Sequence, residues 1–167
     1  GSLALNGGAT YTGTTVLSGT SSSIAYNYNV PPSTPSFSGT GTVTISPASG
    51  TSFTSAFTPN YTFASTLTGL TLGSSINTQD ITLNNALNIN GPINVYGGNL
   101  YVNQSLISSS SGQGILLKST GFVNGASGIT LQTNNGPIII WSNSNGSLTA
   151  GGVWFGDSDT FNTANGS

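Results

Sequence analysis

Apolar residues recur through the second half of the chain in short triplets of the form apolar–x–apolar. A period of two is typical of β-strands, in which successive side chains point to opposite faces of a sheet. Each triplet therefore predicts a short strand with one apolar pair pointing inward. The triplets are Ile81-Thr82-Leu83, Leu87-Asn88-Ile89, Ile93-Asn94-Val95, Leu100-Tyr101-Val102, Ile115-Leu116-Leu117, Ile129-Thr130-Leu131, Ile138-Ile139-Ile140 and Val153-Trp154-Phe155.

The spacing of these triplets predicts how the strands are arranged. Ile93 is followed after 22 residues by Ile115, which is followed after 23 residues by Ile138. A repeat of about 20 to 25 residues is typical of a parallel β-solenoid, whereas a sandwich spaces its strands by about 8 to 12 residues. We therefore expect an all-β parallel β-helix with about seven coils, a rod about 35 Å long, and less than about 10% helix.

The tripeptide Asn135-Gly136-Pro137 lies between two predicted strands and is compatible with a hairpin or with a corner of a coil. Asn-Gly favours a two-residue hairpin turn. Pro137, however, would be the first residue of the next strand, where proline is tolerated. We therefore predict a corner.

The first part of the chain, residues 1–40, is less regular than the rest. Before the regular triplets begin, strands are predicted at Thr15–Leu17, Thr42–Ile45 and Tyr61–Phe63. The proline-rich stretch at residues 30–36 cannot be a helix or a central strand, so we expect a loop that leaves the coil. The composition shifts little there, and residues 1–167 are predicted to be one solenoid segment.

Composition narrows the possible functions. Only Lys118, Asp80, Asp157 and Asp159 are charged, and the chain has no His, Cys, Met, Arg or Glu. Disorder requires low hydrophobicity with high net charge, but 35% of the residues are hydrophobic and the net charge is −2. Acid–base catalysis lacks its usual residues, so we expect no enzyme, no catalytic residue and no cofactor.

The same composition excludes two kinds of partner. One positive side chain cannot neutralise a phosphate backbone, so no nucleic-acid partner is expected. No run of about 18 apolar residues is present, so no membrane span is expected. Asp157 and Asp159 are the only acidic pair and the only candidates for Ca²⁺, but such a site takes six or more oxygens. We favour a solvated turn there and no metal.

The two tryptophans are the candidates for ligand contact. Trp154 should point outward from its strand, and Trp141 follows the inward pair Ile138 and Ile140. Exposed aromatic rings can stack on sugars or anchor a partner. The alternative, which we favour, is that each ring packs at a coil corner or under a neighbouring loop.

From about residue 40 to residue 167 the chain resembles the repeats of filamentous-haemagglutinin-like adhesins of Gram-negative bacteria. The resemblance rests on an expected turn at Leu70-Thr71-Leu72-Gly73, the Ile81 strand, Gly91-Pro92-Ile93-Asn94-Val95-Tyr96-Gly97-Gly98, Gly114-Ile115-Leu116-Leu117-Lys118 and Gly136-Pro137-Ile138-Ile139-Ile140-Trp141. It implies a right-handed parallel β-helix within a very long protein, secreted to the cell surface by a two-partner or related outer-membrane route. Such proteins have no catalytic residues to transfer.

These observations favour a non-catalytic stalk segment of an extracellular adhesin or surface filament. The alternative is a module that itself binds carbohydrates or another cell through exposed aromatic, Asn and Thr side chains. The N-terminus lacks the pattern of a signal peptide, so we expect an internal segment. Leu3, Leu5 and Phe161 alternate like strand residues at the two ends. We therefore expect both ends to pair with neighbouring segments of the same protein, or head to tail with identical subunits.

Overall fold

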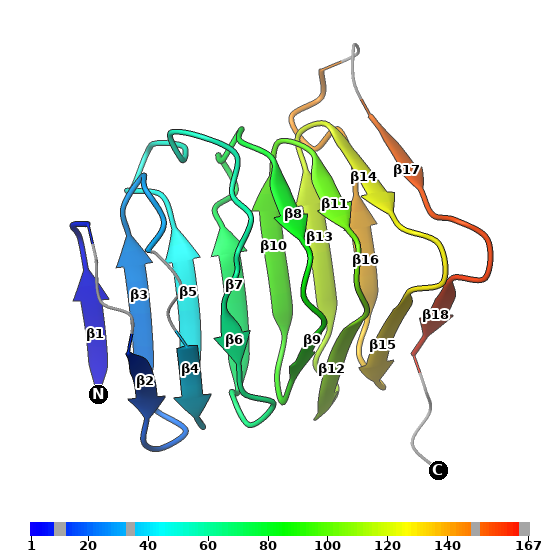
Figure 1. Ribbon diagram of the computed structural model, residues 1–167. Coiled ribbons are helices and arrows are strands. Elements are labelled where there is room, and N and C mark those ends of the chain that lie inside the picture. Colours follow the sequence, from blue (N-terminus) through cyan, green and yellow to red (C-terminus); the bar gives the residue numbers. More distant parts are fainter. Residues whose placement is uncertain (9–12, 33–35, 148–150, 164–167) are drawn as a thin grey trace.

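The chain folds as a parallel β-solenoid whose strands lie side by side along one axis (Figure 1). The computed structural model describes residues 1–8, 13–32, 36–147 and 151–163, and these contain no helix. Every strand pair among them is parallel, as the spacing of the triplets predicted. The solenoid makes about six turns, close to the seven coils expected.

One seven-stranded sheet, here called sheet A, runs the length of the solenoid. Each of its strands belongs to a different coil. In spatial order they are β1 (Ser2–Leu5), β3 (Ser23–Asn27), β5 (Thr42–Ser46), β7 (Gly69–Gly73), β10 (Ile93–Gly97), β13 (Ile115–Ser119) and β16 (Ile138–Trp141).

Two four-stranded sheets close the coils of the C-terminal half, so that each coil there has three sides. Sheet C contains β8 (Ile81–Leu83), β11 (Leu100–Val102), β14 (Phe122–Gly125) and β17 (Gly152–Trp154). Sheet D contains β9 (Leu87–Ile89), β12 (Leu106–Ser111), β15 (Thr130–Asn134) and β18 (Thr160–Asn162).

The N-terminal half is built on the same plan but with fewer strands per coil. Its second sheet, sheet B, contains β2 (Thr14–Leu17), β4 (Ser36–Gly39) and β6 (Thr62–Phe63). A single bridge between Phe57 and Ile81 extends the side formed by sheet C into this half. Strand β1 pairs in unbroken register with β3, and β3 with β5, so the less regular sequence before residue 40 still joins the stack.

A continuous apolar core fills the space between the sheets. Register places inward residues of successive coils directly above one another, as in the column Ile93, Ile115 and Ile138. The predicted core residues Ile93, Val95, Ile115, Leu117, Ile129 and Leu131 are buried, and Ile138 and Ile140 pack against them partly buried. Burial of these side chains is the main stabilising contribution of the fold.

Asn135-Gly136-Pro137 forms a corner, as predicted. Strand β15 pairs with β12 and β18, whereas β16, which follows Pro137, pairs with β13 in sheet A. A Cβ atom on Gly136 would overlap the carbonyl oxygen of Gln113 in the coil below. Glycine is therefore required because two backbones approach closely here.

The sequence misassigned one strand and missed others. Leu70-Thr71-Leu72-Gly73, expected as a turn, belongs to strand β7, because Leu70 and Leu72 alternate into the core. Strands β3, β4, β12 and β14 were not predicted. In β12 and β14 a polar or small residue takes an inward position. In β12 this residue is Ser108, whose buried hydroxyl donates a hydrogen bond to the Gly91 carbonyl at 2.7 Å.

The proline-rich loop follows β3. Residues 28–32 form no strand, and residues 33–35 lie outside the described residues. The Pro32 carbonyl accepts a hydrogen bond from the buried Tyr61 hydroxyl at 2.5 Å. The described part of the loop is therefore tied to the next coil.

Candidate functional site

Three of the four charged side chains, those of Asp80, Lys118 and Asp159, contact a neighbouring coil. Oδ1 of Asp80 accepts a hydrogen bond from the backbone amide of Asn99 at 2.7 Å. Lys118 points outward from β13, and its Nζ lies 4.3 Å from the centroid of the Trp141 ring. Within the described part of the chain, no three His, Cys, Asp or Glu side chains converge as metal ligands would.

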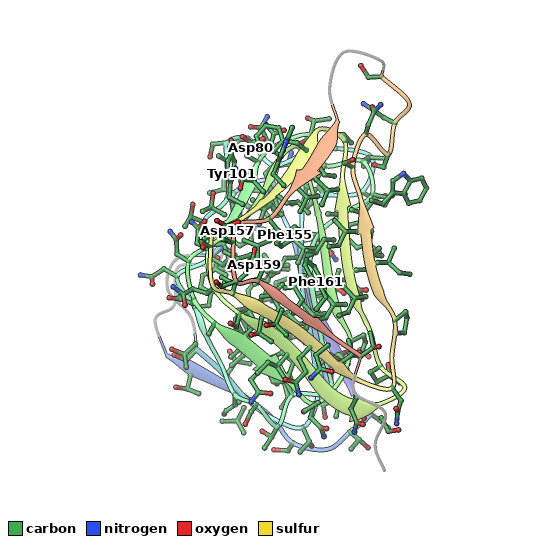
Figure 2. The ribbon with its side chains drawn as sticks, turned by 90° about the vertical axis from the view of Figure 1, so that its right-hand side faces the viewer. Asp80, Tyr101, Phe155, Asp157, Asp159 and Phe161 are labelled. Atoms are coloured by element: carbon green, nitrogen blue, oxygen red, sulfur yellow. The ribbon has the colours of Figure 1, made fainter. Side chains whose placement is uncertain are left out.

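Asp157 and Asp159, the Ca²⁺ candidates, lie in the turn between β17 and β18 (Figure 2). Oδ1 of Asp159 accepts a hydrogen bond from the Ile129 amide at 2.9 Å. The Ser127 hydroxyl donates to the Asp157 carbonyl oxygen at 2.6 Å. These bonds fasten the turn to the preceding coil, so one carboxylate serves as a clamp between coils.

Trp141 ends strand β16 and points outward from sheet A. It lies in one column with Lys118 and Tyr96 of the two preceding coils, because these residues are register partners. The Lys118 ammonium covers one face of the ring, which is a favourable cation–π geometry. The Trp141 ring is half exposed, but Lys118 already covers one of its two faces.

Trp154 lies on a different side of the solenoid, in strand β17 of sheet C. Its ring packs edge to face against Phe122 at a centroid distance of 5.6 Å, and Phe122 packs in the same way against Tyr101 at 5.4 Å. The three rings form a strip along the axis. Within the strip, each contact joins the edge of one ring to the face of the next. The structure therefore does not bring the two tryptophans together.

The C-terminal coil exposes side chains whose register partners in the preceding coils of sheets C and D are buried in the core. Val153 is the register partner of Val123, and Phe161 is the register partner of Leu131. Val123 and Leu131 are 0% and 1% exposed, whereas Val153 and Phe161 are 45% and 49% exposed. Val153 thus points inward as predicted, but the described chain places no further coil over it.

These side chains form one surface at the end of the core. Phe155 and Phe161 pack edge to face at 4.9 Å, and both lie on the coil nearest the viewer in Figure 2. Among the described residues, β16, β17 and β18 are the last strands of sheets A, C and D, so each has an edge with no described strand beside it. We call Ile138, Ile140, Val153, Phe155 and Phe161 the terminal apolar surface.

The first coil shows the same feature at the other end. Strand β1 is the first strand of sheet A and pairs only with β3. Leu3 is the register partner of the buried Ile24, yet Leu3 itself is exposed. Both ends of the described solenoid therefore present an apolar column and an open strand edge.

Hydrogen bonds between amide and hydroxyl side chains form ladders that join neighbouring coils, and their positions were not predicted from the sequence. The Asn27 amide donates to Oδ1 of Asn6 at 3.2 Å, and the Asn103 amide donates to Oδ1 of Asn84 at 2.8 Å. The signal is present in the sequence, because these pairs are 21 and 19 residues apart, about one coil. In a chain this rich in asparagine, however, spacing alone does not single them out.

No family model matches this chain, and neither a curated protein nor a solved structure matches it. The described residues also contain no helix that is long and apolar enough to cross a membrane. Function must therefore be argued from the geometry of the solenoid.

Proposed function

We propose that this chain is a structural stalk segment of a large extracellular adhesin or filament at the bacterial cell surface, and that it is not catalytic. The observation that carries the proposal is the uncovered core at the two terminal coils. Val153 and Phe161 occupy columns that are buried wherever another coil follows. A further coil, from a neighbouring segment or a second copy, would bury them in the same way.

Mechanical logic supports this role. In a solenoid each coil pairs with the next at about 4.8 Å, so that adding coils lengthens the rod without changing its cross-section. Open strand edges template pairing with another chain. The register is unbroken from β1 to β16 in sheet A, so the same pairing rule would continue past either end.

Head-to-tail association is the property to test. We expect light scattering of the wild-type chain to show elongated assemblies that grow with protein concentration. Phe161→Asp should weaken association at least about tenfold, because covering an unpaired charge with another coil costs several kcal/mol.

Ile76→Asp is the matched control. Ile76 is as exposed as Phe161, at 49%, but lies in the loop after β7, away from the terminal apolar surface, so this variant should assemble like the wild type. A chain that stays monomeric at all concentrations, with slow amide exchange in its first and last coils, would contradict the proposal. Equal association of both variants would contradict it as well.

A further inference from the structure

A groove with a volume of about 610 Å³ lies at the ends of the first strands of sheet A. Its lining combines the amides of Asn6 and Asn27, the hydroxyls of Ser46 and Ser74, and the apolar side chain of Ile76. No charged residue is among the lining residues. The volume is in the range of small-molecule sites, about 300 to 1,000 Å³.

The floor of the groove is a ladder across three coils. The Ser46 hydroxyl donates to Oδ1 of Asn27 at 3.1 Å, and the Asn27 amide donates to Oδ1 of Asn6 at 3.2 Å. Each asparagine amide carries two hydrogens, so the ladder leaves donor capacity on Asn27 and Asn6, both of which line the groove. The ladder also fixes the orientation of these amides.

Both walls of the groove are held in place by hydrogen bonds. In the loop after β5, Oδ1 of Asn29 accepts hydrogen bonds from the Ala48 amide at 2.9 Å and the Thr51 hydroxyl at 2.7 Å. In the loop after β7, the backbone amide of Asn77 donates to the backbone carbonyl of Ser74 at 2.9 Å. A site whose walls are already ordered loses less entropy when a ligand binds.

One hydroxyl in the groove wall has no hydrogen-bond partner among the described residues. Oγ of Ser74 is buried and makes no hydrogen bond. Buried polar groups are nearly always paired, so an exception calls for an explanation. Rotation of Ser74 about χ1 between staggered positions would turn this hydroxyl toward a ligand in the groove.

We propose that this groove binds an uncharged saccharide. A saccharide presents hydroxyl groups, which the amides and hydroxyls of the groove can pair, and C–H faces, which Ile76 can cover. Anionic or cationic ligands find no opposite charge in the lining. The groove lies away from the terminal apolar surface, and of its lining residues only Asn6 belongs to the first coil, so the saccharide site is a separate property from end-to-end assembly.

The tryptophans are weaker candidates for the same ligand. Lys118 covers one face of Trp141, and Trp154 packs against Phe122. Both rings thus have structural contacts of their own, and they lie on different sheets. The groove instead gathers donors, acceptors and an apolar side chain in one concave place.

The test is a titration of the isotope-labelled chain, followed by NMR of its amides. The probes are cellotetraose, maltotetraose and lacto-N-tetraose, with sialyllactose as the acidic counterpart. We expect at least one neutral probe to shift the amides of residues 46, 48–50 and 74–76. Asn27→Ala should weaken its binding about tenfold through loss of hydrogen bonds.

Asn103→Ala is the matched control, since it breaks an equivalent ladder outside the groove and should change affinity less than about twofold. Should Asn27→Ala fail to fold, Ser74→Ala and Ile76→Ala replace it, and each should weaken binding several-fold. Absence of shifts with every neutral probe, shifts only with sialyllactose, or shifts elsewhere on the chain would overturn the proposal. Affinities that none of the groove variants change would overturn it too.

Discussion

At the scale of single residues, neutral polar side chains supply many of the hydrogen bonds that join one coil to the next. Asn77 is the fullest case and is 1% exposed. Its Oδ1 accepts hydrogen bonds from the Ser52 hydroxyl at 2.8 Å and the Phe53 amide at 3.2 Å, both in the preceding coil. Its amide donates to the Tyr96 carbonyl of the following coil at 3.1 Å. One asparagine thus joins three coils.

Asn77→Ala should lower the free energy of unfolding by about 3 kcal/mol, because it leaves several buried polar groups unpaired. Urea denaturation followed by circular dichroism measures this loss. Asn103→Ala, which removes one exposed amide–amide bond, should cost less than about 1 kcal/mol. Similar losses in the two variants would show that the burial of Asn77 is not what matters.

At the scale of the element, alternation along a strand decides which side chains support the fold. In β13 the side chains of Ile115 and Leu117 are buried, and those of Leu116 and Lys118 point outward. Register then stacks the inward pair between Ile93 and Val95 below and Ile138 and Ile140 above. Two adjacent leucines of equal hydrophobicity therefore make unequal contributions to stability.

Leu117→Asp should unfold the C-terminal coils, because a buried unpaired carboxylate costs several kcal/mol. Leu116→Asp places the same group on the outer face and should change the free energy of unfolding by less than about 1 kcal/mol. Amide exchange of the sheet A strands measures both effects. Equal protection in the two variants would contradict the inward–outward assignment.

At the scale of the whole molecule, the solenoid is a nearly neutral rod. Four charged residues in 167 leave its surface to amide and hydroxyl groups. Its stability comes from the apolar core and from hydrogen bonds between coils, both of which act without long-range electrostatics. Salt screens exposed charges over about 10 Å at 0.1 M, and here there is little charge to screen.

The melting temperature should therefore shift by no more than about 1–2 °C between about 10 mM and 0.3 M NaCl, since less than about 0.5 kcal/mol of screened interaction is at stake. Differential scanning calorimetry measures this shift. A change of many degrees would mean that one of the few charged contacts, such as the clamp at Asp159, carries far more of the stability than its exposure suggests.

The sequence by itself determined most strands of the C-terminal half, the coil period and the core residues of those strands. These depend on local geometry, because a period of two fixes which side chains share a face. The corner at Gly136-Pro137 was predictable for the same reason, since proline and glycine restrict the backbone wherever they occur. Strands such as β12, whose inward Ser108 hides the pattern, lay beyond this rule.

Only the tertiary structure decided which polar residues meet. It paired Asn6 with Asn27, gathered Ser74 and Ile76 beside them in one groove, and placed the two tryptophans on different sheets. Each of these relations depends on how one coil lies over the next. That register is set by the packing of the whole core and the lengths of the loops between strands, so no local pattern of residues contains it.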